Sequence, residues 1–216
     1  YLVKKKNIVV PENLYEEKRE NVRKRELCLA FPITSSSRKH KVYSYLPTEI
    51  HSGLPFLVNA DFLLPASRES VLVDREWNLW MQSELANFAS EEINELVTTV
   101  PSSRSFHWIP VHSDCTSEFF KPVFERVIGR LKDLDFIPST FGQSISPNNA
   151  HYSPRALANL LEKMGSCESE YGFVSTDVLY FSKQLKPIVA HQTVDVDTLS
   201  DFFQSASKFL KTLPMS

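Results

Sequence analysis

Glycine, paired cysteines and long apolar runs are all scarce in this sequence of 216 residues. Only five glycines accompany thirteen prolines, so we expect proline to mark many of the turns. Cys28, Cys115 and Cys167 lie far apart without a CxxC pair, which argues against a disulfide framework and a zinc site and favours a reducing compartment. No apolar run approaches membrane-spanning length and we find no signal peptide, so we expect an intracellular protein, cytoplasmic or nuclear, without a membrane partner.

Motifs for nucleotide binding and nucleophilic catalysis are also missing. The sequence contains no Walker-type loop, no GxGxxG and no glycine-rich nucleophile elbow. His107, His112, Asp114 and Cys115 do cluster in sequence. We favour an ordinary loop there, with a Cys/His hydrolase using Cys115 and His112 as the minor alternative. Because no second ligand pair follows at a usual spacing, we expect no metal site.

Charge is nearly balanced overall, with a formal net charge of -2. Residues 1–50 nevertheless hold eleven Lys/Arg against six Asp/Glu, a balance of +5. The global charge gives no reason to expect nucleic acid as a partner. The runs "KKK" at 4–6 and "RKR" at 23–25 are interpreted as solvated faces, with an anion site as the less favoured alternative.

Hydrophobic periodicity predicts strands first and helices later, which is typical of the α+β class. The first strands are expected to form an antiparallel meander, covered by two helices. The expected strands are 2–11, 27–33, 41–47 and 54–64, and the covering helices are 74–99, with Asp74 as N-cap and a possible break near Ser90, and 116–134. Later come a strand-turn-strand at 136–147, a helix from an N-cap at Ser153, a short strand near 172 and a helix at 197–210. We divide the chain into a domain at 1–134, with strands at about 27–68, and a smaller α+β appendage at 135–216.

In the stretch "NADFLLPASRES" (59–70), Arg68 is expected to lie at a tight turn directly after a buried strand. Ser67 and Glu69 are placed to hold the Arg68 side chain. One interpretation is a structural salt bridge with an internal carboxylate. The other is a rigid guanidinium directed at a phosphate on a neighbouring domain, a role that suits the permanent charge and forked donors of arginine.

Two longer stretches resemble the segment downstream of the ATP-binding domain in sacsin-like and plant No Vein-like proteins of the GHKL superfamily. They are "YSYLPTEIHSGLPFLVNADFLLPASRESV", continuing into "REWNLWM", and "FKPVFERVIGRLKDLDFIPSTFGQSISPNNA". The resemblance covers roughly residues 27–150. The matching residues are Leu46, Pro47, Gly53, Leu54, Pro55, Val58, Asn59, Phe62, Leu64, Arg68, Trp77, Asn78, Ile137, Pro138, Gly142 and Pro147.

The resemblance implies a middle or transducer-like segment of an Hsp90-type chaperone ATPase. "LLPASRE" is similar to the chaperones' middle-domain stretch whose arginine reaches the γ-phosphate of ATP on the N-terminal domain. By that resemblance Arg68 is a catalytic residue acting in trans, and Arg68 and Ser67 contact the γ-phosphate.

The superfamily's own nucleotide site is missing from this chain. It needs an Asn/Glu-bearing helix, an Asp-x-Gly motif and a glycine-rich lid, none of which is present. We therefore expect a fragment that does not hydrolyse ATP by itself and holds no cofactor, with ATP and Mg²⁺ bound elsewhere in the full-length protein. Its expected partners are the upstream ATP-binding domain of its own chain and client proteins. The alternative is an interaction scaffold without nucleotide dependence, in which the basic N-terminal region or the aromatic helix docks a partner.

Overall fold

The computed structural model describes residues 1–34, 40–163 and 172–191, and a few positions between 194 and 204. It divides into two compact units, Tyr1–Arg130 and Leu131–Ser216. The secondary structure confirms the α+β class. The domain boundary at 134/135 stays a prediction about which parts fold separately.

A five-stranded sheet forms one layer of the first unit. Its strands are β1 (Leu2–Val9), β2 (Lys24–Phe31), β3 (Lys41–Ser44), β4 (Leu46–His51) and β5 (Leu57–Asn59), in the order β1-β2-β5-β3-β4. β5 is antiparallel to β2 but parallel to β3. The expected simple meander is therefore wrong: β5 inserts between β2 and β3.

The expected strand at 41–47 is in fact a tight hairpin. Tyr45 has a φ of 60° and turns the chain, so that Ser44 pairs directly with Leu46. A left-handed residue ends an extended strand because its backbone reverses direction. This local reversal creates β4, which the alternating pattern alone did not predict.

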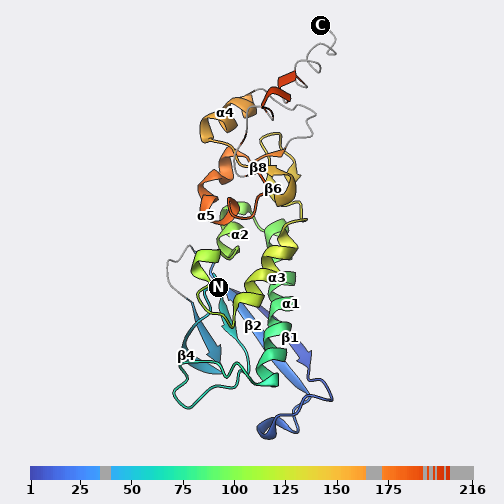
Figure 1. The fold of residues 1–216 in the computed structure, drawn as a ribbon, viewed down its shortest axis with the longest axis vertical. Coiled ribbons are helices and arrows are strands. Elements are labelled where there is room, and N and C mark those ends of the chain that lie inside the picture. The colour runs from blue at the N-terminus through green and yellow to red at the C-terminus, as the bar shows by residue number, and fades with distance from the viewer. Residues whose placement is uncertain are drawn as a thin grey trace. The chain divides into compact units, whose positions relative to one another are not determined.

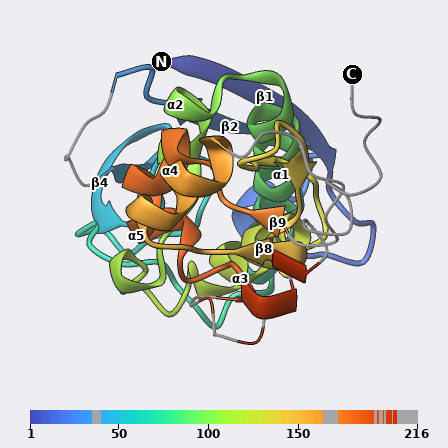
Figure 2. The ribbon, with the colours of Figure 1, turned by 90° about the horizontal axis from the view of Figure 1, so that it is seen from above.

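One long helix, α1 (Glu76–Thr99), lies beside β1 and β2, as Figures 1 and 2 show from two directions. It continues through Ser90, so the break considered there is absent. Arg75 occupies the N-cap instead of Asp74 and forms no side-chain cap. α2 (Ser102–Ser105) and α3 (Lys121–Leu131) follow, with short 3-10 helices at Glu17–Arg19, Phe106–Trp108 and His112–Asp114. Pro122 falls in the first turn of α3, where a missing N–H costs nothing.

Aromatic side chains fill the core of this unit. Phe31 contacts Phe56 and Trp108 at ring-centroid distances of 4.9 and 5.4 Å. Trp77 and Phe88 of α1 are 1% and 2% exposed. The aromatic residues of α1 are thus largely core residues, which removes that helix face as a docking surface for the scaffold alternative.

The lysines of β1 are paired within the unit. Lys4 forms ion pairs with Glu92 and Glu95 of α1, at 2.9 and 3.2 Å. Lys6 pairs with Glu91 of the same helix at 2.7 Å, and Lys5 with Glu26 of β2 at 2.9 Å. "KKK" therefore lies on a solvent-exposed face, as interpreted from the sequence, but each ammonium group has a carboxylate partner, which argues against an anion site.

The second unit is built from short elements. They are β6 (Ile137–Pro138), β7 (Ser144–Ile145), β8 (Ala150–His151), α4 (Arg155–Lys163), β9 (Gly172–Phe173) and α5 (Ser182–Leu185), with 3-10 helices at Pro147–Asn149 and Thr176–Phe181 (η5). The predicted strand-turn-strand is confirmed by the antiparallel β6–β7 pair. β8 and β9 pair in parallel. The predicted helix at 197–210 falls largely outside the described residues.

No helix in the described part of the chain is both long and apolar enough to cross a membrane. α1 has the length, but it carries several glutamates.

Candidate functional site

Three chain segments meet at the end of the sheet where β3 and β5 finish. Because β3 and β5 are parallel, their last residues, Ser44 and Asn59, lie at the same end. Cys28 of the antiparallel β2 pairs with Asn59, so Arg25 also lies toward this end. We call this region, with Arg19, Arg25, Tyr45, Asp61 and Arg68, the arginine end.

Arg68 is fixed there by its backbone and by its side chain. Its φ is 58°, and its N–H donates to the carbonyl of Pro65 at 3.0 Å. Its Nη2 donates to the carbonyls of Ser44 and Leu46, at 3.0 and 2.9 Å, and its Nε to the carbonyl of Pro47 at 3.4 Å. The guanidinium therefore holds the outside of the β3–β4 turn.

No carboxylate of the described chain pairs with Arg68. Its bonded partners are neutral carbonyls, and Ser67 and Glu69 are exposed and make no hydrogen bond with its side chain. The expected support from Ser67 and Glu69 is thus replaced by the hairpin carbonyls. Because carbonyls do not neutralise a charge, the half-buried guanidinium keeps its positive charge, and its Nη1 has no hydrogen-bond partner among the described residues.

A second pair of arginines shares one buried carboxylate. Asp61 is 3% exposed and accepts from Arg19 through both oxygens, at 2.8 Å from Nε and 2.5 Å from Nη2. Nε of Arg25 adds a third bond at 2.5 Å. Both guanidinium groups lie over the ring of Trp77, at 5.2 and 5.8 Å from its centroid. Two cations face one anion, so this cluster has one positive charge in excess.

Tyr45 lies at the turn that Arg68 holds. Its backbone lies between the Ser44 and Leu46 carbonyls that Arg68 binds, and its N–H donates to Oδ1 of Asn59, the last residue of β5, at 3.1 Å. In the neighbouring cluster, the hydrogen bond to Asp61 raises the pKa of Arg19 against the opposing effect of burial.

The first turn of α1 anchors the segment that carries Arg68. The indole N–H of Trp77 donates to the carbonyl of Asp61 at 2.8 Å. Asn78, fully buried, accepts from the N–H of Leu63 at 2.8 Å and donates to the carbonyls of Leu63 and Leu72, both at 2.9 Å. Residues 61–72 are thus tied to the helix on both sides of Arg68.

The Cys115 region shows no assembled nucleophile. His112 packs edge-on against the Phe124 ring at 5.6 Å. It is bonded to Cys115 only through the backbone, where the Cys115 N–H donates to the His112 carbonyl at 3.2 Å, and within the described residues its imidazole does not bond to the thiol. Burial, followed by the charges of Glu118 and Glu125, raises the pKa of the Cys115 thiol. A thiol held protonated is a weak nucleophile, so this geometry does not favour the hydrolase alternative. The described residues also contain no group of three His, Cys, Asp or Glu side chains that could hold a metal ion.

The sequence drew attention to Arg68, and to Arg25 only within the run "RKR" at 23–25, interpreted there as a solvated face or an anion site; Arg25 instead pairs with Asp61. It drew no attention to Arg19 or Asp61. Asp61 was read only as part of a strand, and Arg19 sat in a charged segment without periodicity. An acid within an apolar run, "NADFLL", was the signal that could have found the cluster, because a buried carboxylate requires a cationic partner.

A comparison with curated proteins links part of the chain to a plant protein. The chain is 32% identical over 74 residues to "Protein NO VEIN" of Arabidopsis thaliana, a match that covers 31% of this chain and 3% of that protein. No family model and no solved structure matches the chain. The chain therefore spans a small fraction of this relative's length, and the match supports a No Vein-like relation for that part of the chain.

Proposed function

We propose that the first unit is a coupling segment of a larger No Vein-like protein. In this proposal, the arginine end receives the terminal phosphate of a nucleotide bound by another domain of the longer chain. The unit does not hydrolyse the nucleotide itself. It senses whether the phosphate is present and passes that state on as a rearrangement of domains.

One observation carries the proposal: the two non-glycine residues with positive φ in the described chain, Tyr45 and Arg68, meet at the same place. Such backbone conformations cost on the order of 1–3 kcal/mol each and concentrate at functional sites. Here the strained backbone at Tyr45 and Arg68 holds the guanidinium of Arg68, which no carboxylate of the described residues neutralises, on the β3–β4 turn. At a purely structural corner, glycine would adopt the positive φ at a lower free-energy cost.

The hydrogen bonds of Arg68 suggest how the signal would pass. Charge-assisted bonds from guanidinium to phosphate are roughly twice as strong as bonds between neutral groups. An arriving phosphate can use the free Nη1 or compete with the carbonyls of Ser44 and Leu46 for Nη2. Loss of the carbonyl bonds would release the β3–β4 turn, so the hairpin would respond to the phosphate.

The test uses the full-length protein together with the nucleotide-binding domain that the proposal requires. ATP binding and turnover are measured for wild type, Arg68→Ala, Arg68→Gly and Arg68→Lys, with Arg104→Ala as control because Arg104 is exposed on α2. We expect turnover to fall at least about tenfold in the three Arg68 variants, a loss of about 1.4 kcal/mol in transition-state stabilisation, while ATP affinity holds.

Arg68→Gly separates signalling from folding. Glycine relieves the positive φ, so this variant should lose less stability than Arg68→Ala while losing the same activity. If turnover in the variants follows thermal stability instead of the presence of the guanidinium, the corner is structural and the proposal is wrong.

The scaffold alternative rests on a different observation. Tyr45 and Leu46 are 69% and 64% exposed at the tip of the hairpin, where they could contact a protein partner. The test is a double variant, Tyr45→Ser and Leu46→Ser. If this variant no longer binds the partner protein while the Arg68 variants leave ATP turnover unchanged, the result supports the scaffold function over the coupling function.

A further inference from the structure

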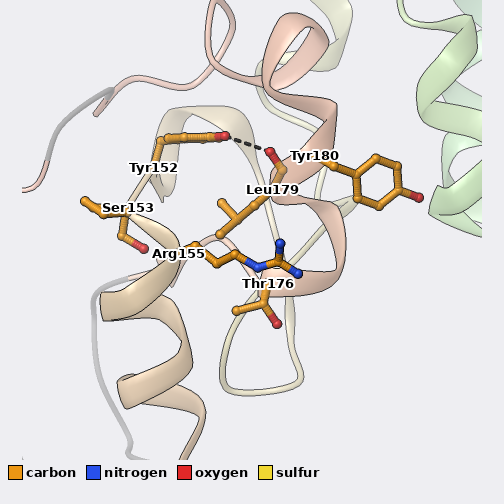
Figure 3. A pocket seen from close by; sticks show the side chains of 7 residues that line it. Tyr152, Ser153, Arg155, Thr176, Leu179 and Tyr180 are labelled. Carbon is orange, nitrogen blue, oxygen red and sulfur yellow. Dashed lines mark hydrogen bonds between the residues drawn. The ribbon is translucent and has the colours of Figure 1, made fainter.

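The second unit contains a cavity of about 220 Å³ at the start of α4, shown in Figure 3. One wall comes from the chain entering the helix and the other from the 3-10 helix η5. The lining residues are Tyr152, Ser153, Pro154, Arg155, Thr176, Leu179 and Tyr180. No feature of the proposed coupling function involves this cavity.

Ser153 contributes a buried hydroxyl without a partner. The residue is 1% exposed, and its Oγ makes no hydrogen bond in the part of the chain described. It was expected to cap the helix, but the structure shows no such bond. A buried hydroxyl left unpaired costs about 1–3 kcal/mol, so an occupant that bonds to it would recover free energy.

The helix start supplies two further donors. α4 begins at Arg155 and has nine residues, and its first backbone bonds run from Leu157 and Ala158 to the carbonyl of Pro154. The N–H groups of Arg155 and Ala156 have no partner among the described residues. Such free N–H groups, together with the helix dipole, favour an anion at a helix N-terminus.

Arg155 adds a full positive charge. In Figure 3 its side chain extends from the start of α4 toward Thr176 on η5. Its guanidinium makes no ion pair with any described residue. The acid in contact with the lining, Glu162, already accepts from the N–H and Oγ1 of Thr176, both at 2.9 Å, and from Oγ of Ser175 at 3.2 Å. Three donors satisfy that carboxylate without Arg155.

We propose that this cavity is a binding site for a small phosphomonoester. The unpaired hydroxyl of Ser153, the N–H groups at the start of α4 and the guanidinium of Arg155 are distinct donors around one space. Three terminal phosphate oxygens can use them together, whereas a carboxylate offers two. Tyr152, Pro154, Leu179 and Tyr180 form the apolar part of the lining, which suits a compact apolar or aromatic ester group.

The experiment titrates the full chain with phenyl phosphate, inorganic phosphate and benzoate, measured by calorimetry and by amide NMR shifts. Phenyl phosphate should bind most tightly and shift the amides of Arg155 and Ala156. Arg155→Ala should weaken its binding at least about tenfold, because the charged donor is lost. Lys163→Ala, which removes an exposed charge from the other end of the same helix, should leave affinity unchanged.

Ser153→Ala provides an independent check of the unpaired hydroxyl. It should weaken phenyl phosphate binding without lowering thermal stability, because the free protein makes no hydrogen bond there. Equal affinity for benzoate would overturn the assignment to phosphate esters. Unchanged Arg155 and Ala156 amides on saturation, or full affinity in Arg155→Ala, would overturn the site itself.

Discussion

Gly53 shows at the scale of one residue why this chain keeps a glycine where it has so few. Its φ is 76°, and a Cβ at this position would lie 2.2 Å from the carbonyl oxygen of Asp114 and 2.8 Å from Cα of Cys115. Both contacts are with backbone, which cannot move aside like a flexible side chain. The loop at Gly53 therefore packs directly on the 114–115 segment because no side chain separates them.

We predict that Gly53→Ala destabilises the first unit by about 2–4 kcal/mol, from the positive φ and the backbone overlap together. Denaturant unfolding followed by tryptophan fluorescence measures this, because all three tryptophans, Trp77, Trp80 and Trp108, lie in this unit.

Gly129→Ala is the matched control for that measurement. Gly129 lies in α3, where a Cβ would have no atom of the described residues within 4 Å, so alanine should stabilise the unit by about 0.5–1 kcal/mol. If Gly53→Ala were as stable as wild type, the close approach to the 114–115 backbone would be contradicted.

The sequence indicated a corner at Arg68, whose role at a phosphate stays a prediction, but it did not indicate features that geometry decides. Arg68 stood out because an arginine follows a buried strand. The left-handed backbone at Tyr45 did not, since tyrosine has no preference for it and only the closure of the hairpin imposes it. The shared carboxylate of Asp61 depends on contacts more than 30 positions along the chain, which no local pattern reports.

At the scale of elements, the first turn of α1 fastens a loop as well as starting a helix. Asn78 uses both ends of its amide on the backbone of Leu63 and Leu72. We predict that Asn78→Ala costs about 2–4 kcal/mol, because it leaves buried backbone groups unpaired. Leu79→Ala, at a 47% exposed position of the same turn, should cost much less. Chemical denaturation of the two variants checks the difference, and equal losses would contradict the role of Asn78.

Glu162 links α4 to η5 in a pH-dependent way. Burial raises the pKa of its carboxyl, but the hydrogen bonds from Thr176 and Ser175 outweigh that effect and leave the pKa below its ordinary value of 4.5. The folded state thus binds fewer protons than the unfolded state. The stabilisation is complete above about pH 4.5 and is lost as the pH falls through the folded value.

We therefore predict that the second unit loses stability on acidification below about pH 4.5, and that Glu162→Gln loses less over that range. Thermal unfolding between pH 7 and pH 3, followed by circular dichroism, measures both proteins. Identical pH profiles for wild type and Glu162→Gln would contradict the assignment.

Helices were easier to predict than the order of strands. The three-and-four spacing of apolar residues predicted α1 and α3, because a helix is specified by neighbours within its own turn. The helix α4 was predicted from an expected N-cap at Ser153. The sheet order needed the position of β5 between β2 and β3, which depends on pairing between distant segments. A meander is the simplest order of strands along a chain, and this chain does not adopt it.

At the scale of the whole molecule, we predict that residues 1–134 fold alone. This segment contains the sheet, α1 and the complete α3, whose Val123 and Val127 are fully buried, as is Phe120 just before the helix. It should show one cooperative unfolding transition by tryptophan fluorescence. Residues 1–116, which lack Phe119 and Phe120 against Phe62, should not. A segment 1–134 without a cooperative transition would contradict the prediction.

The lysines of β1 have one consequence beyond their ion pairs with α1 and β2. β1 is an edge strand of eight residues, and an unpaired strand edge is a template for pairing with another molecule. Two copies joined antiparallel about Lys5 would place lysine opposite lysine at three successive positions. Like charges directly across a pair of strands are repulsive. The same lysines that pair with carboxylates of α1 and β2 thus oppose edge-to-edge aggregation of the protein.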